Sequence, residues 1–558
     1  MDRRHFLALA ATAGLVAACG PGPGAGPRAA TGRDAPGGGS HAAPEAGAGL
    51  RPRTAVGVRG ETAGERAGFP NRLGIPPLID PEPGPDGVRR FELTAQAGRS
   101  RPGDTAPTWG FNGDLLGPTL RLRRGDEVQV AVTNALEEAT TVHWPGLRLP
   151  AAVASGPHRP IAAGGTWTGR WVVDQPAATA WYHPYPLGPS AGHTGRGLAG
   201  LLIVDDYTRR RGLPSAYGVD DIPLILHDPR PGSAGSTAGD ARPGGGVLVN
   251  GTADPFLTVT SERVRFRVVN GSDGRVFDLA FADGRPFHVV GNDAGLLAAS
   301  VEVSRVSVAP GERVELVVAF THGENVLLRS LDGRGAAERD AGQASEQDGG
   351  LDSGEHGGLD GGLDGGLDGG EDGEGGGGPS VERDGLDLLK IVVAPRLTAA
   401  RPVPRRPAVG LLPIEVPPGA RVRRFRTAGQ GPRGTDPTRT DTVVPAAGTE
   451  VWEIENPAGP AVFHLQGASF QVLDVDGDPA PPYARGYKDT VRLPARAAVR
   501  LAVRFGGLAD PYAPYLYHFR ALGRVGMGTT GRFVIVQPGD EGRTPRAPVL
   551  RPTSDDLQ

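Results

Sequence analysis

Sulfur is nearly absent from this chain, whose 558 residues include one cysteine and two methionines. A single thiol excludes an intrachain disulfide framework and any zinc or iron–sulfur site that needs several cysteines. A site for a soft metal would therefore have to depend on histidine. The scarcity of methionine also argues against methionine-rich loops for copper storage or delivery.

The chain also lacks a strong net charge. Lys+Arg 59 against Asp+Glu 63 gives a formal net charge of −4 at pH 7, so no global positive field favours nucleic acid or anionic lipid as a partner. Nucleic-acid binding is not expected. Two catalytic classes find no support either, because the sequence holds neither a Gly-x-Ser-x-Gly elbow nor a Walker phosphate loop.

No apolar run is long enough to cross a bilayer as a helix; the longest, from Phe6 to Ala18, falls short of the ~20 residues required. It follows the twin arginines Arg3 and Arg4 and ends at Cys19, a pattern that predicts a twin-arginine export signal over 1–19. The residues before Cys19 resemble a lipobox, so we expect this cysteine to be lipidated and to anchor the protein to a membrane of the cell envelope. The alternative is a plain cleaved signal in which the cysteine is discarded.

Residues 20–75 are rich in Gly, Pro, Ala and Arg without apolar periodicity, which predicts a flexible tether. A second biased segment, 332–385, repeats Gly-Gly-Leu-Asp four times, and from 332 to 384 it holds 15 acidic and 3 basic residues, a net charge of −12. Like charges on a Gly-rich chain repel, so we predict a disordered surface insert. Aspartates on Gly-rich turns also leave calcium binding open as an alternative.

Elsewhere, short runs of β-branched and apolar residues are separated by Gly, Pro, Asn and Asp. Residues 127–132 (Glu-Val-Gln-Val-Ala-Val) and 498–505 (Ala-Val-Arg-Leu-Ala-Val-Arg-Phe) alternate with period two. This pattern is typical of antiparallel strands in sandwiches or barrels. We therefore predict an all-β fold of three consecutive Greek-key β-sandwich or barrel domains. Their predicted boundaries are 76–206, 207–395 (which contains the insert) and 396–540, followed by a tail over 541–558.

Histidine stands beside aromatic residues in four strand or turn contexts: 141–146 (Thr-Val-His-Trp-Pro-Gly), 181–186 (Trp-Tyr-His-Pro-Tyr-Pro), 462–467 (Val-Phe-His-Leu-Gln-Gly) and 515–520 (Tyr-Leu-Tyr-His-Phe-Arg). With other motifs in the expected order, these resemble the multicopper oxidase family of laccases, cuprous oxidases and bilirubin oxidases. The other motifs are Asn112-Gly113, Gly117-Pro118-Thr119, Arg124-Gly125-Asp126, Arg196 to Gly200, Val249-Asn250-Gly251, Ala309 to Arg313 and Tyr487 to Val491. The resemblance covers about 90–540 and implies cupredoxin domains with copper between the first and the third.

The same resemblance implies that most copper ligands have been replaced. Each motif keeps one histidine: His143 and His464 at type 2 positions, and His183 and His518 at type 3 positions. The remaining ligand positions hold Pro145, Tyr185, Ala461, Gln466, Phe519, Arg520, Arg524 and Thr529. A type 1 copper needs a thiolate and two imidazoles, which Phe519, Ala461 and Arg524 do not supply.

Arg520 and Arg524 add fixed positive charge, which opposes the binding of a Cu²⁺ ion nearby. Two interpretations of the histidines remain. They are neutral, hydrogen-bonded residues that fill the former copper cavity, or His143 and His464 still hold one copper ion. In the first case we expect Arg520 to replace the lost metal charge by donating hydrogen bonds to Tyr185 and Gln466.

The favoured prediction is an exported, lipid-anchored envelope protein that has no catalytic residues, needs no cofactor and binds an unidentified envelope protein. In its degenerate ligands and export route it resembles the copper-free, twin-arginine exported, cell-division-associated member of the family. The alternative is a copper-binding oxidoreductase with one residual mononuclear site at His143 and His464.

Overall fold

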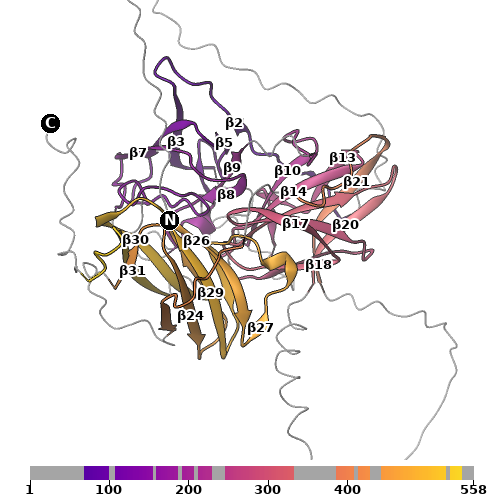
Figure 1. Ribbon diagram of the computed structural model, residues 1–558. Coiled ribbons are helices and arrows are strands. Elements are labelled where there is room, and N and C mark those ends of the chain that lie inside the picture. Colours follow the sequence, from indigo (N-terminus) through magenta and orange to yellow (C-terminus); the bar gives the residue numbers. More distant parts are fainter. Residues whose placement is uncertain are drawn as a thin grey trace, which may run out of the picture. The chain divides into compact units, whose positions relative to one another are not determined.

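The computed structural model describes residues 68–99, 107–154, 159–186, 192–206, 212–228, 246–331, 385–407, 413–427, 441–522 and 528–542. Within these ranges the chain forms six β-sheets, and its only helices are two single 3-10 turns, η2 (Thr194–Arg196) and η4 (Pro482–Ala484). The predicted all-β class is therefore confirmed (Figure 1). None of the helices in the described residues has the length and apolar character needed to span a membrane.

The first domain consists of two four-stranded sheets. In spatial order, one sheet contains β4 (Trp109–Phe111), β3 (Val88–Ala97), β6 (Glu127–Asn134) and β7 (Thr166–Val172). The other contains β2 (Leu78–Ile79), β5 (Thr119–Arg123), β9 (Gly200–Asp205) and β8 (Ala178–Tyr182). Strand β6 shows the expected alternation, since every second side chain from Val128 is buried.

The second domain has the two largest sheets. One contains β1 (Asn71–Arg72), β13 (Pro255–Ser261), β21 (Gly385–Thr398), β20 (Asn325–Leu331), β15 (Phe277–Phe281) and β18 (Arg305–Val308). The other contains β12 (Thr252–Ala253), β11 (Leu248–Val249), β10 (Asp221–His227), β14 (Arg263–Asn270), β19 (Arg313–Ala319), β16 (Phe287–Asn292) and β17 (Gly295–Val303). The orange strand β21 lies among the magenta strands of this domain in Figure 1, so the segment between β20 and β21 joins two neighbouring strands.

The third domain has two five-stranded sheets. One contains β22 (Val422–Arg426), β24 (Thr449–Asn456), β29 (Ala497–Phe505), β26 (Ala468–Val475) and β27 (Asp478–Pro479). The other contains β23 (Thr442–Pro445), β31 (Gly528–Val536), β30 (Asp510–Ala521), β25 (Ala461–Leu465) and β28 (Thr490–Leu493). The last sheet carries two of the four histidine motifs.

Two expectations from the sequence need correction. The alternation predicted antiparallel strands, but β3 pairs in parallel with β6 and β22 with β24, so the sheets are mixed. Alternation reports which side of a sheet is buried and not the direction of the neighbouring strand. Residues 68–75, placed in the tether, belong to the folded part, because β1 pairs with β13 and Leu73 is buried in the second domain's core.

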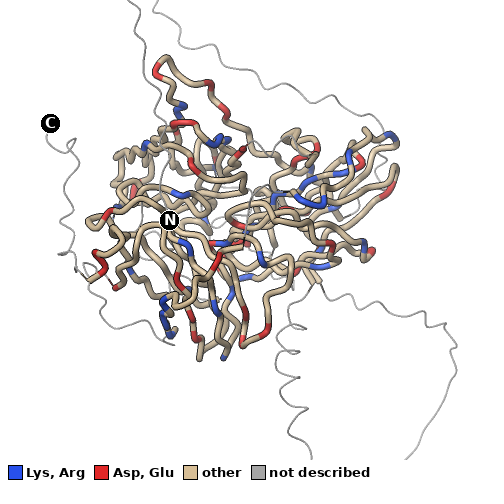
Figure 2. Tube along the Cα trace, in the orientation of Figure 1, with Lys and Arg blue, Asp and Glu red and all other residues tan. Residues whose placement is uncertain are grey.

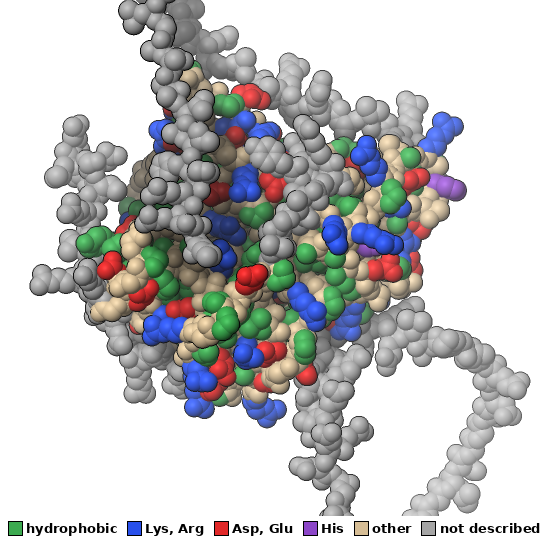
Figure 3. Space-filling model, viewed as in Figure 1, with side chains coloured by type: hydrophobic (Ala, Val, Ile, Leu, Met, Phe, Trp, Pro, Cys, Tyr) green, Lys and Arg blue, Asp and Glu red, His purple; other side chains and the backbone are tan. Residues whose placement is uncertain are grey.

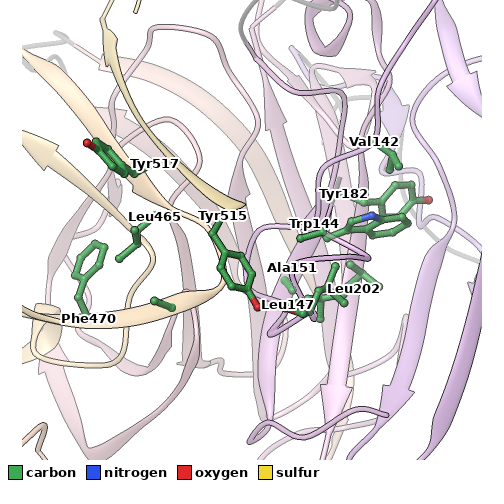
Figure 4. Packing of buried hydrophobic residues seen from close by; sticks show 14 of the residues in the cluster. Val142, Trp144, Leu147, Ala151, Tyr182, Leu202, Leu465, Phe470, Tyr515 and Tyr517 are labelled. Carbon is green, nitrogen blue, oxygen red and sulfur yellow. Dashed lines mark hydrogen bonds between the residues drawn. The ribbon is translucent and has the colours of Figure 1, made fainter. Parts of the chain in front are cut away.

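The first and third domains share one continuous hydrophobic cluster. Figure 4 shows Tyr515 of β30 projecting from the third domain toward Leu147 and Ala151 of the first. Its hydroxyl donates a hydrogen bond to the Leu149 carbonyl oxygen at 2.8 Å. This contact fixes the two histidine-bearing domains against each other and so positions the site between them.

Candidate functional site

Strands β25 and β30 present one row of side chains to the other domains. They pair antiparallel with His464 opposite His518 and Val462 opposite Arg520. Because successive side chains point to opposite faces, these four lie on the same side of the sheet. All four line a cavity where the three domains meet.

The opposite face of the same two strands points into the core of the third domain. Phe519 lies opposite Phe463, with ring centroids 5.1 Å apart, and both belong to an aromatic cluster around Trp452. Ala461 is buried on this face, and Thr529 of β31 pairs with Phe519. Two of the positions predicted to have lost type 1 ligands, Phe519 and Ala461, are therefore packed in hydrocarbon.

The first domain contributes its two histidines from neighbouring segments. His143 and His183 form an antiparallel bridge, in which the His143 N–H donates to the His183 carbonyl oxygen at 2.7 Å and the His183 N–H returns a bond at 3.1 Å. The His183 ring stacks on Trp181 at 3.8 Å between centroids. Both histidines are buried, and the stacking fixes the His183 ring at the cavity wall.

Across the domain boundary the histidines bond to other side chains. The Nε2 atoms of His143 and His464 are 3.0 Å apart, so one ring donates to the other. His464 Nδ1 lies 3.0 Å from the Thr490 hydroxyl, and His518 Nδ1 lies 3.1 Å from the Tyr185 hydroxyl. The structure thus brings all four predicted histidines, together with Tyr185, into one cluster.

Arg520 has a partner that the sequence did not indicate. Its Nη1 lies 3.4 Å from the Asp273 carboxylate of the second domain, and both side chains are mostly buried. Beside it, the Tyr185 hydroxyl lies 3.1 Å from His518 Nδ1, and Gln466 Oε1 accepts the Leu516 N–H at 3.1 Å. The arginine therefore connects the third domain to the second, a domain with no place in the predicted site.

The cavity at this junction has a volume of about 30 Å³ and includes Pro145 in its wall. A cavity needs roughly 10–15 Å³ of such volume to hold one water molecule, so only one or two fit. Two buried nitrogens, His143 Nδ1 and Trp181 Nε1, have no hydrogen-bond partner among the described residues. Such atoms are normally satisfied by water, which suits a cavity of this size.

Burial sets the protonation state of the cluster. Desolvation lowers the pKa of His143, His183 and His518 well below 6.5, and neighbouring positive or titratable groups lower it further. For His183 and His518 these neighbours include Arg520. The three imidazoles are therefore neutral at pH 7, and each offers one donor and one acceptor.

Comparisons with known proteins identify the lineage of this fold. Sequence models described as Multicopper oxidase match residues 94–209 and 414–539. Cell division protein FtsP of Sodalis glossinidius (strain morsitans) is 32% identical over 489 residues, which cover 84% of this chain and 93% of that protein. The chain belongs to the multicopper oxidase family. FtsP of Escherichia coli (strain K12) is 29% identical over 500 residues and covers 86% of this chain and 95% of its own length.

Solved structures of the multicopper oxidase family show the same architecture. The laccase from Pediococcus acidilactici Pa5930 superposes with a TM-score of 0.67 at 26% identity, over 84% of this chain and 94% of its own. The laccase-like multicopper oxidase CueO from Ochrobactrum sp. gives 0.66 at 28% identity, over 83% of this chain and all of its own. The three sandwiches are therefore cupredoxin-like domains.

Membership of the multicopper oxidase family implies copper, but the residues present do not fit it. The Nε2 atoms of His143 and His464, the two positions that would face a type 2 ion, lie 3.0 Å apart. Within the described ranges, no group of three or more His, Cys, Asp or Glu side chains is arranged to hold a metal. The buried guanidinium of Arg520 adds a positive charge beside His183 and His518. Arg524 and Cys19 lie outside the described residues.

Sequence reasoning missed the charged residues that join the three cupredoxin-like domains. The buried Arg313 of β19 donates two bonds of 2.7 Å to the Asp489 carboxylate of the third domain and one of 3.3 Å to the Thr179 carbonyl oxygen of the first. Burial opposes ionisation of Asp489, but the charge and hydrogen bonds of Arg313 outweigh it and hold the pKa of Asp489 well below its ordinary value. Lys488 adds ion pairs to Asp293 at 3.1 Å and Glu312 at 3.2 Å.

A signal for these residues was present in the sequence. Arg313 ends one of the motifs that carry the family resemblance, and Asp489 lies in another. Nothing in either motif indicated that the two side chains meet, since 176 residues separate them.

Proposed function

We propose that this protein acts in bacterial cell division as a non-catalytic member of the multicopper oxidase family that binds another protein of the cell envelope. Relatives over nearly the whole folded part carry the name cell division protein FtsP. The three domains are packed together, and the described residues contain no fitting metal site. We therefore expect the protein to act by binding a partner through its surface. The partner is a protein that the sequence does not identify.

One observation carries the non-catalytic part of the proposal. His143 and His464 use their Nε2 atoms on each other at 3.0 Å, and the former type 1 positions hold Phe519 and Ala461 in a packed core. A blue-copper relay needs a thiolate and two imidazoles at those positions. The type 1 site, through which electrons enter in this family, therefore lacks its copper ligands here.

Export and anchoring complete the proposal. The twin arginines at positions 3 and 4 and the apolar run that follows support export in the folded state, and Cys19 supports lipid attachment. In a Cys19→Ser variant the protein should be released from the membrane fraction by a high-salt wash, whereas the lipidated wild type should stay bound. Equal release of the two proteins by salt would overturn the lipid anchor.

Copper loading tests the loss of catalysis. The purified full chain is incubated with Cu²⁺, freed of excess ion and assayed for bound copper, for blue absorption and for oxidation of a phenolic laccase substrate. We expect less than one copper per chain and no substrate oxidation. The control is His143→Gln, which keeps a polar side chain and removes an imidazole. One bound copper in the wild type that this variant abolishes would revive the residual mononuclear site.

Division is tested in the organism that encodes the chain. Deleting the gene should lengthen cells because septation is delayed, and the wild-type chain should restore their length. The His143→Gln variant should restore it equally, because no metal chemistry is needed. Rescue by the wild type together with failure of a stably folded His143→Gln would contradict the non-catalytic role.

A further inference from the structure

The end of β21 and the segment that follows it carry a row of exposed arginines. From residue 388 to 414 the sequence has Lys390, Arg396, Arg401, Arg405 and Arg406 and no acidic residue. Figure 2 shows Lys and Arg scattered among Asp and Glu over the described trace, and in the other dense basic run Arg423, Arg424 and Arg426 pair with glutamates. All four arginines are exposed, and we call residues 396–406 the arginine strip.

Within the described residues, none of the four arginines of the strip forms an ion pair with a carboxylate. Two exposed arginines of other strands are paired in this way: Arg424 of β22 lies 3.2 Å from Glu453, and Arg170 of β7 lies 2.8 Å from Glu127. The charge of the strip is therefore available to a ligand outside the chain.

The backbone of the strip is held to the second domain. The Ser300 N–H of β17 donates to the Arg405 carbonyl oxygen at 3.0 Å, and the Ala400 N–H donates to the Glu262 carboxylate at 3.0 Å. Prolines at 402 and 404 restrict the chain between these two points to extended conformations. The strip therefore presents its guanidinium groups from a fixed, extended edge.

Apolar side chains that could form the centre of a protein interface are missing from the strip. The large hydrophobic side chains exposed in the described residues belong to other segments: Val172, Val219, Val416, Val422, Leu508 and Tyr512. On the face seen in Figure 3, apolar side chains form small groups between charged ones. Stable protein interfaces depend on a buried apolar or aromatic centre, so the strip suits a partner recognised by charge alone.

We propose that the arginine strip binds the anionic phospholipid headgroups of a membrane surface. Guanidinium groups bind phosphate through paired hydrogen bonds, and rows of basic residues bind anionic bilayers without an apolar pocket. A single lipid chain gives only marginal membrane attachment, which a basic surface strengthens. The strip therefore orients the second domain toward the membrane, whether or not Cys19 is lipidated.

Vesicle binding by the full chain tests the proposal. The protein carries Cys19→Ser, so that acylation does not contribute, and is floated with vesicles of equal parts phosphatidylglycerol and phosphatidylcholine or of phosphatidylcholine alone. We expect binding to the anionic vesicles, weaker binding at high salt and none to the neutral vesicles. Equal binding to both kinds of vesicle would overturn the proposal.

The variant Arg401→Ala/Arg405→Ala/Arg406→Ala locates the binding surface. Each arginine near an anionic bilayer contributes about fivefold to partitioning, so the triple change should weaken binding about 100-fold. The matched control is Arg421→Ala/Arg424→Ala/Arg426→Ala, which removes the same charge from β22 and should change binding only slightly. Both variants should unfold at the wild-type temperature, because the removed side chains are exposed.

Two outcomes contradict the strip as a lipid site. In the first, the strip variant and the β22 control lose equal affinity for anionic vesicles. This would mean that the overall charge of the protein, and not the strip, causes the binding. In the second, the strip variant keeps its affinity for anionic vesicles but loses affinity for poly-glutamate, which would assign the strip to an acidic protein partner.

Discussion

His143 and His464 face each other across the boundary between the first and third domains, with their Nε2 atoms 3.0 Å apart. In a copper protein both atoms would direct lone pairs at an ion. Here one ring must carry a proton on Nε2 and the other must accept it, so the pair joins the domains directly. The bond links the same two domains that a bridging metal ion would link.

A double-mutant cycle measures this bond. His143→Ala and His464→Ala should each destabilise the protein, and the double variant should lose about 1 kcal/mol less than the sum of the two, because the shared hydrogen bond is lost only once. Urea unfolding of the four proteins supplies the free energies. Strict additivity would mean that the two rings do not interact in solution.

Arg313 should be the costliest single side chain at the domain junction. Arg313→Ala removes both hydrogen bonds to Asp489 and leaves a buried carboxylate unpaired, which costs about 3–5 kcal/mol. The matched control is Arg424→Ala, whose ion pair with Glu453 is mostly exposed on the arginine side and contributes about 1 kcal/mol or less. Chemical unfolding compares the two variants, and similar losses would contradict the role of Arg313.

Acid should destabilise the protein through its buried histidines. The folded pKa values of His143, His183 and His518 lie well below the ordinary value of 6.5, because burial disfavours the charged ring. The unfolded chain therefore binds protons below pH 6.5 that the folded chain does not. Stability is fully present above that pH and is lost as the pH falls, by about 4 kcal/mol for the three residues between pH 7.5 and 5.5.

His183→Phe isolates one of these contributions. The phenyl ring keeps the stacking on Trp181, while the titrating group is removed. The loss of stability between pH 7.5 and 5.5 should shrink by about one third. The exposed His322 provides the control, since His322→Gln should leave the pH dependence as it is in the wild type. An unchanged slope for His183→Phe would mean that this ring binds protons equally in the folded and the unfolded chain.

The sequence predicted the fold well where the evidence was local. Alternating runs such as β6 and β29 have buried and exposed sides where the period of two places them. Strand direction was not predictable, because the parallel pairing of β3 with β6 depends on connections across 30 residues or more. Leu73 was misplaced in the tether because a two-residue strand such as β1 leaves no periodic pattern.

For the site, the sequence identified the residues but not all of their partners. The four histidines meet as the motifs implied. Arg520 reaches Asp273, 247 positions away along the chain, a partner that the sequence did not indicate. The pairing of Arg313 with Asp489 was equally hidden. Contacts between distant charged residues depend on how the domains dock, which one sequence does not report.

Phe519 lies on the side of β30 that faces the core of the third domain. Phe519→Cys restores a thiol at this position, but Thr529, which pairs with it, and Ala461, on the same face of β25, offer no imidazole. The variant should therefore remain colourless with Cu²⁺ and should lose about 3 kcal/mol of stability, because a buried ring is replaced by a small side chain.

The neighbouring Phe463 gives a matched control for this substitution. It is fully buried on the same face, and Phe463→Cys should be destabilised to a similar degree and equally colourless. Absorption spectra after copper loading and urea unfolding distinguish the outcomes. A blue copper band in Phe519→Cys alone would show that the type 1 site lacks only its thiolate. In that case the hydrocarbon packing around Ala461 would not be the barrier to copper, and the loss of the site would depend on a single residue.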